Sequence, residues 1–261
     1  MRTALTIAGS DPSGGAGVQG DLKTFHACGV YGMAVLTALT AQNTTGVSSV
    51  HDVPADFVRA QLDAVLDDLP VHAAKTGMLA KAAVIEAVVA ALGERPVPFL
   101  VVDPVMVATS GDPLINDEAV GRMVELLFPL ATVVTPNLDE AARLLGRPVR
   151  DLAGMHAAAQ WIRDRGAQAV LVKGGHLAGG EVTDLLLNGG QLHEWRDARI
   201  DTDHTHGSGC ALAAALAASL AKGLSLVDAV ACARTFVRRG LEQAVVLGKG
   251  RNPLNHLARP E

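Results

Sequence analysis

The residues best suited to chemistry lie between Thr205 and Cys210, directly ahead of an alanine-rich run. Gly207, Ser208 and Gly209 are small residues at an expected helix start, where backbone N–H groups have no intrahelical acceptor and the helix dipole is positive. Such a helix start can stabilise a phosphoryl group during its transfer. The dipole also favours the thiolate of Cys210, so we expect this residue to act as a base or nucleophile. A cysteine that only packs against the helix is the alternative.

A second polar group follows an apolar run at residues 132–135. Asn137 and Glu140 lie three residues apart at another expected helix start, so they share a face. Glu140 could hold a water molecule of Mg²⁺, which usually keeps several waters in phosphoryl-transfer sites. The same spacing suits a capping box, and both interpretations can hold together. Asp103, which directly follows an apolar run, is a second candidate residue near the metal, although Asp-Pro is also a common turn start.

Gly15, Gly17 and Gly20 match the GxGxxG pattern of dinucleotide-binding proteins. The context does not fit this pattern. The preceding apolar run ends near Ala8, so residues 9–14 separate it from Gly15, whereas the pattern places its first glycine at the turn that leaves the strand. The next apolar run ends at residues 40–43, which include no carboxylate to hold a ribose. We expect these glycines to let a helix begin close to the sheet, or to form a wall of the substrate site. No Walker A sequence occurs in the chain.

The cysteines do not form a zinc or disulfide framework. Cys28, Cys210 and Cys232 include no CxxC pair, and the odd number leaves at least one thiol unpaired, as is common in a reducing cytosol. His204 and His206 lie near Cys210, but no further ligand pair has zinc-like spacing. The N-terminus lacks the apolar region and cleavage site of a signal peptide, so we expect a cytoplasmic protein.

The remaining segments must position these groups. Short apolar runs alternate with helix-length segments, which predicts an α/β protein with a mainly parallel sheet and helices on both faces. The expected strands are 4–8, 33–40, 72–75, 99–102, 132–135 and 169–173. The expected helices are 54–66, 80–92, 117–127, 137–145 and 152–165. A hairpin is expected to join 183–187 to 191–195, and two helices broken at Gly223 are expected over 207–246. Ligands bind at the carboxyl ends of such strands. The polar groups should therefore meet along one rim.

Composition agrees with a single α/β domain over residues 1–261. Hydrophobic residues make up 49% of the chain and charged residues 19%, which excludes a disordered protein. With 22 basic and 27 acidic residues the formal net charge is −5, so neither a nucleic acid nor a membrane surface is an expected partner. A small molecule is the expected substrate.

Seven sequence blocks, in order, resemble the ribokinase-like vitamin kinases, and among them the hydroxymethylpyrimidine/phosphomethylpyrimidine kinases of thiamine biosynthesis. The blocks are residues 4–17, 37–44, 75–79, 101–106, 135–140, 173–177 and 205–210. The resemblance covers nearly the whole chain. It implies a ribokinase-like three-layer sandwich, usually a homodimer, that uses ATP and Mg²⁺.

The resemblance also implies a role for each matching residue. Gly207, Ser208 and Gly209 would form the anion hole, and Cys210 would be the base where most ribokinase-like sugar kinases carry aspartate. Gln42 would bind the pyrimidine. The other implied site residues are Gly9, Asp21, Met78 and Val105 on the substrate side, Asn137, Lys173 and Thr205 on the nucleotide side, and Glu140 with Asp103 near the metal. Departures from the family pattern occur at Gly20, His204, Ser208 and the tail 251–256.

The implied reaction moves the γ-phosphoryl group of ATP to the hydroxymethyl group of 4-amino-5-hydroxymethyl-2-methylpyrimidine. A second transfer would convert the monophosphate to the diphosphate. A pyridoxine or pyridoxal kinase of the same fold is the enzyme alternative. A catalytically silent vitamin-binding or regulatory protein is the alternative outside enzymes.

Overall fold

A central eight-stranded sheet organises the molecule, for which a computed structural model describes residues 1–107, 114–175 and 180–258. The strand order is β10-β9-β8-β7-β6-β5-β1-β2, parallel from β8 to β2 and antiparallel for β9 and β10. The strands are β1 (Thr3–Ala8), β2 (Tyr31–Leu36), β5 (Ala73–Thr76), β6 (Leu100–Val102), β7 (Val133–Val134), β8 (Ala169–Val172), β9 (Glu181–Asn188) and β10 (Gln191–Ala198). The predicted mainly parallel α/β sheet is confirmed.

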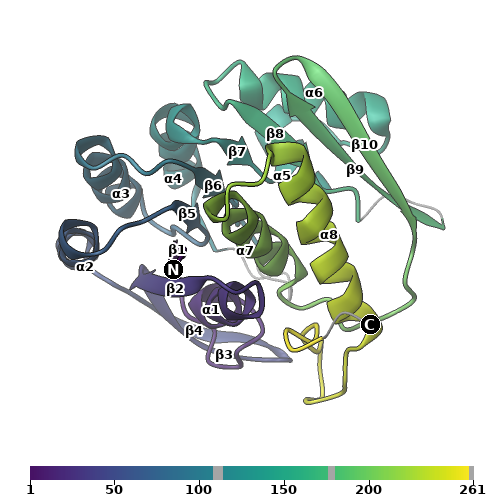
Figure 1. The fold of residues 1–261 in the computed structure, drawn as a ribbon, viewed down its shortest axis with the longest axis horizontal. Helices are drawn as coiled ribbons and strands as arrows, with labels where there is room; N and C mark the ends of the chain where they lie inside the picture. The colour runs from purple at the N-terminus through teal and green to yellow at the C-terminus, as the bar shows by residue number, and fades with distance from the viewer. Residues whose placement is uncertain (108–113, 176–179, 259–261) are drawn as a thin grey trace.

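Helices cover both faces of this sheet (Figure 1). One layer holds α2 (Ala55–Asp68), α3 (Ala82–Glu94), α4 (Asp117–Arg122), α5 (Leu138–Leu145) and α6 (Leu152–Arg163). The other holds α1 (Gly17–Ala27), α7 (Ser208–Ala221) and α8 (Leu226–Glu242). Neighbouring residues of a strand therefore enter opposite cores: Val102 packs into the first layer and Val101 into the second. Burial on both faces explains why the strands are continuous apolar runs.

Helix α7 lies in the middle of its layer, between α1, α8 and the sheet (Figure 1). Residues 211–221 are all buried, and most of them are alanine. Small side chains let the helix axis come close to the strands, which brings its first turn to the sheet's carboxyl edge. The alanine-rich run is thus a packing surface that places the N-terminus of α7 at that edge.

Two elements differ from the sequence prediction. The expected strand 33–40 is two strands, because the chain leaves the main sheet at Thr37 and β3 (Ala38–Asn43) pairs with β4 (Gly46–Asp52) in a separate antiparallel hairpin. The expected helix 117–127 is α-helical only as far as Arg122 and continues as a π-helical turn. Pro129, which has no N–H to donate, lies in the turn that follows.

No helix in residues 1–107, 114–175 and 180–258 is long and apolar enough to cross a bilayer. Residues 176 and 177, which belong to the sequence block 173–177, lie outside the described residues.

Candidate active site

A cavity of about 960 Å³ lies where the parallel strands end. It brings together every site residue predicted from the sequence except Asp21. The predicted residues that line it are Gly9, Gln42, Met78, Asp103, Val105, Asn137, Glu140, Lys173, Thr205, Gly207, Ser208, Gly209 and Cys210. The catalytic and binding roles assigned to them remain predictions.

The anion hole predicted at the start of α7 is built on Gly207. This residue has φ +76°, and a Cβ atom on it would overlap the Gly15 carbonyl oxygen, so only glycine fits. Ser208 donates its N–H to the Thr205 carbonyl at 3.1 Å and is engaged within the turn. Gly209 and Cys210 follow in the first turn, whose N–H groups lack intrahelical acceptors, and both line the cavity. Their amides are therefore better placed for an anion than that of Ser208.

A buried ion pair borders this helix start. Lys173 donates from Nζ to Asp103 Oδ1 at 2.9 Å, and the Thr135 hydroxyl donates to the same oxygen at 3.1 Å. Burial opposes ionisation of Asp103, but the Lys173 and Lys75 ammonium groups outweigh it and lower the pKa of this carboxyl group. A Cβ on Gly209 would lie 3.2 Å from Lys173 Nζ, so the ammonium group adjoins the first turn of α7. The positive charge is available beside the anion hole.

Glu140 forms the capping box that its spacing predicted. Its Oε2 accepts from the Asn137 N–H at 2.8 Å, and Asn137 Oδ1 accepts from the Glu140 N–H at 2.9 Å. The carboxyl group is nevertheless part of the cavity wall. Burial raises its pKa to about 7, although Lys173 acts in the opposite direction. The capping and metal-related interpretations are geometrically compatible.

Asp21 does not occupy the predicted place on the cavity wall, because helix α1 turns its carboxylate into the interior. There it pairs with Lys75, whose Nζ donates to Asp21 Oδ2 at 2.9 Å, and Thr6 Oγ1 donates to the same oxygen at 2.6 Å. Both charged side chains have no exposed surface. Burial opposes a charge on Lys75, but Asp21, Cys210 and Asp103 outweigh it and raise the lysine pKa. Asp21 therefore does not line the cavity, and its assigned substrate-binding role stays a prediction.

Cys210 has a different electrostatic setting from the one expected. Burial raises the pKa of its thiol to about 11, and the negative charges of Asp103 and Asp21 act in the same direction. The Lys75 ammonium group and a hydrogen bond from the Gly17 amide act against them. The predicted stabilisation of the thiolate by the helix dipole does not decide the outcome, because loss of hydration costs the anion more. The thiol is protonated at neutral pH.

Gln42 reaches the cavity from the β3–β4 hairpin rather than from the main sheet. Thr40 Oγ1 lies 3.2 Å from Gln42 Oε1 and 2.9 Å from the Ser10 carbonyl oxygen, so its one proton is shared between them. Met78 lies against Gly9, next to Ser10, since a Cβ on Gly9 would come within 3.1 Å of its sulfur. This end of the cavity combines one amide with apolar side chains.

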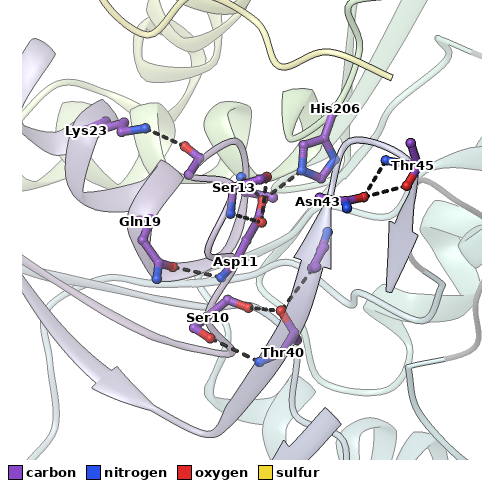
Figure 2. Close-up of polar contacts among 12 residues, drawn as sticks. Ser10, Asp11, Ser13, Gln19, Lys23, Thr40, Asn43, Thr45 and His206 are labelled. Carbon is purple, nitrogen blue, oxygen red and sulfur yellow. Dashed lines mark hydrogen bonds and ion pairs between the residues drawn. The ribbon is translucent and has the colours of Figure 1, made fainter. Parts of the chain in front are cut away.

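The sequence prediction assigned no role to Asp11, His206 or Lys75, although each lies in a block that it quoted. Asp11 and His206 form a buried pair, with 2.7 Å between Oδ2 and Nε2 (Figure 2). All three line the cavity. The signal available in the sequence was a polar or charged residue within a glycine-rich loop segment, as for Asp11 and His206, or near the end of an apolar strand, as for Lys75.

Within the described residues no group of three His, Cys, Asp or Glu side chains could hold a metal ion. Mg²⁺ in kinase sites commonly takes only one or two carboxylates and completes its shell with water and phosphate oxygens. Glu140 and Asp103 fit that donor set, because both are buried carboxyl groups that line the cavity, and burial raises the pKa of Glu140 despite the nearby Lys173.

Comparisons with known proteins agree with this geometry. A protein 52% identical over 262 residues is the hydroxymethylpyrimidine/phosphomethylpyrimidine kinase of Rhizobium meliloti, with 98% of this chain and 97% of the relative covered. An ADP complex of Bacillus subtilis pyridoxal kinase superposes with a TM-score of 0.92 at 39% identity, covering 99% and 98% of the two chains. A phosphomethylpyrimidine kinase from Clostridium difficile 630 superposes with a TM-score of 0.81 at 39% identity, covering 91% and 98%.

The sandwich and the glycine-rich helix start define a ribokinase-like kinase. A family model described as phosphomethylpyrimidine kinase matches residues 11–255. The chain belongs to the phosphomethylpyrimidine kinase family.

Proposed function

We propose that this kinase uses ATP to phosphorylate 4-amino-5-hydroxymethyl-2-methylpyrimidine, and then its monophosphate, for thiamine biosynthesis. One observation carries the proposal: the Cys210 thiol, the first turn of α7 and the Gln42 amide face one cavity. That arrangement offers a base, an anion site and an aminopyrimidine partner within reach of one small molecule. The name of the Rhizobium meliloti relative supports the same substrate.

In the first transfer the hydroxymethyl oxygen forms a bond to the γ-phosphorus while the bond from that phosphorus to the ADP oxygen breaks. Cys210 accepts the hydroxyl proton in the small fraction of molecules in which it is a thiolate at neutral pH. The Gly209 and Cys210 amides and the Lys173 ammonium group stabilise the equatorial phosphoryl oxygens, because a loose transition state mainly requires positioning and charge stabilisation. In the second transfer the acceptor is a phosphate whose second pKa is near 6. It is already ionised at neutral pH and needs no base.

Mg²⁺ would be held through Glu140 and Asp103, with Asn137 and Thr205 on the nucleotide side. The ion would neutralise charge on the transferring phosphates. Lys173 keeps Asp103 ionised and adjoins the phosphoryl site. The homodimer implied by the family resemblance also remains a proposal, and the molar mass in solution tests it.

Glu140→Gln should weaken the Mg²⁺ dependence of turnover without lowering the melting temperature. Glutamine retains the capping box but carries no charge, and the folded-state pKa of about 7 lies above the ordinary value for glutamate. The glutamate charge therefore costs stability as pH rises through that range. In the unchanged protein the apparent Mg²⁺ affinity should increase as pH rises through about 7, and the variant should lose this increase.

Mg²⁺ titrations of initial rate at pH 6 and pH 8, with melting curves, make the measurement. Glu118→Gln, at an exposed position in the first turn of α4, is the matched control. An unchanged Mg²⁺ dependence in Glu140→Gln would leave Glu140 with its capping role alone.

Pyridoxal phosphorylation is the second candidate function, favoured by the closer superposition on pyridoxal kinase than on the phosphomethylpyrimidine kinase structure. Gln42 should decide between the two. Its amide can pair with an amino group and an adjacent ring nitrogen, as amides do with adenine. Pyridoxal has no exocyclic amine and would leave a buried polar group unmatched, at a cost of roughly 1–3 kcal/mol.

We therefore expect the protein to prefer the pyrimidine over pyridoxal by about tenfold or more in kcat/KM. Gln42→Leu should remove most of that preference. Coupled assays with both vitamins test this, and Gln168→Leu, an exposed glutamine that does not line the cavity, is the matched control. Equal turnover of the two vitamins by the unchanged protein would give pyridoxal phosphorylation precedence.

A further inference from the structure

Asp11, in the loop after β1, accepts four hydrogen bonds through one buried carboxylate (Figure 2). Oδ1 accepts from the Ser13 N–H at 2.9 Å and the Ser13 hydroxyl at 2.7 Å. Oδ2 accepts from the Ala16 N–H at 2.8 Å and lies 2.7 Å from His206 Nε2. Burial opposes ionisation, but the His206 and Ser13 hydrogen bonds outweigh it and lower the Asp11 pKa to about 2. The carboxylate thus stays ionised and fixes the shape of its loop.

His206 joins this loop to two segments from the far end of the chain. Its side chain is 6% exposed, and its N–H donates to the Asn252 carbonyl at 3.2 Å, next to the bridge between His206 and Pro253. A Cβ on Gly15 would overlap both the His206 ring and Pro253, so the loop backbone packs directly against them. The following residue, Gly207, begins the helix that carries the anion hole.

The two loops joined by this pair serve different halves of the proposed reaction. Residues 9–16, the loop after β1, border the cavity and are called the acceptor loop here, and Gly17 begins α1 directly after them. The Gly17 amide lies near enough to Cys210 to lower the pKa of its thiol. Phosphoryl transfer requires the acceptor oxygen and the phosphorus to lie in line, and a misplacement of about 1 Å can cost on the order of 10²-fold in rate. The distance between these loops is therefore critical.

We propose that Asp11 and His206 are positioning residues, whose hydrogen bond aligns the acceptor loop with the anion hole at the start of α7. The inference rests on the proposed kinase function but not on the choice between the two vitamins. Asp11 and His206 move no proton to or from the substrate. They act through Gly17 and Gly207, the backbone positions that they hold together.

His206→Ala should lower kcat by about 10²-fold while KM for ATP and for the vitamin changes less than about threefold. His206→Gln should restore most of the rate, because its amide can donate a hydrogen bond from near the position of Nε2. Ser13→Ala is the matched control: it removes one hydroxyl from Oδ1, retains the pair and should leave kcat within about threefold.

Steady-state kinetics of these variants and of Asp11→Asn, with circular dichroism and melting curves, make the test. In a double-mutant cycle, Asp11→Asn with His206→Ala should be scarcely slower than either single variant, since both remove one interaction. Should His206→Ala fail to fold, the test uses the other two variants. The positioning role then requires a low kcat in Asp11→Asn and a nearly unchanged kcat in His206→Gln. A glutamine variant as slow as the alanine variant, additive losses, or a raised KM with unchanged kcat would each overturn the positioning role.

Rates are compared between variant and unchanged protein on whichever vitamin the unchanged protein phosphorylates. If that vitamin is pyridoxal alone, the proposed substrate is wrong and the test of the pair still stands. If the pyrimidine is phosphorylated and His206→Ala is as fast as the unchanged protein, the pair has no positioning role and the proposed function stands.

Discussion

Replacing Cys210 with alanine should slow phosphorylation of the hydroxymethyl group about 10²-fold or more, the usual loss when a general base is removed. Phosphorylation of the monophosphate should lose much less, because that acceptor is already ionised. The two half-reactions are measured separately by following ATP consumption with each acceptor. Cys232→Ala, at an exposed cysteine outside the cavity, is the matched control.

The pH dependence gives an independent readout for Cys210. The thiol pKa of about 11 lies above neutral pH, so the reactive thiolate becomes more abundant as pH rises. In the unchanged protein kcat/KM for the alcohol should increase by up to about tenfold per pH unit between pH 7 and 9. The alanine variant should lack this increase. Equal losses in both half-reactions, with the same pH profile as before, would make Cys210 a packing residue.

Lys75→Met should lower the free energy of unfolding by about 3–5 kcal/mol, because it leaves the Asp21 carboxylate buried without its partner. Adding Asp21→Asn should restore a large part of that loss, since the double variant removes both charges of this pair. Urea unfolding followed by circular dichroism measures both. Lys81→Met breaks an exposed pair, with Lys81 Nζ 3.3 Å from Asp52 Oδ2, and should change stability by less than about 1 kcal/mol.

The loss in Lys75→Met should widen as pH rises. Burial already raises the pKa of Asp21 in the folded state, and removing the ammonium group raises it further. An acid with a raised folded-state pKa is most favourable below its unfolded pKa and costs stability as pH rises towards the folded value. A loss of the same size at pH 4 and pH 8 would show that the effect comes from packing rather than from the unpaired charge.

The sequence predicted most strands of the main sheet well, because strands buried on both faces are continuous apolar runs that are easily recognised. Residues 100–102 and 169–172 were found almost to their ends for this reason. The break at Thr37 was missed because the sequence on either side favours extended backbone equally. Contacts between segments distant in sequence determine whether the chain continues in one sheet or begins a hairpin. One of them is the hydrogen bond that the Ser10 N–H donates to the Ala38 carbonyl oxygen at 2.9 Å.

For the candidate site, the sequence predicted which residues lie near the cavity better than it predicted where their side chains point or how they ionise. Residues at strand ends and helix starts, such as Asp103 and Gly209, have positions that local pattern and topology together determine. The direction of a side chain on a helix was harder, and Asp21 turns inward to Lys75. The raised thiol pKa of Cys210 could not be predicted from the local sequence either, because it depends on burial by residues from distant parts of the chain.

The β3–β4 hairpin shares no ladder with the eight-stranded sheet, yet it carries Gln42. It is attached through Ser10 on one side and through Thr44, whose carbonyl accepts from the Arg251 N–H at 2.8 Å, on the other. The proposed determinant of specificity and the proposed catalytic groups thus lie in separately paired parts of the backbone. Under this proposal, exchange of residues 38–52 between related enzymes becomes a route to new acceptors, since the graft replaces the Gln42 amide and leaves the parallel sheet and the start of α7 untouched.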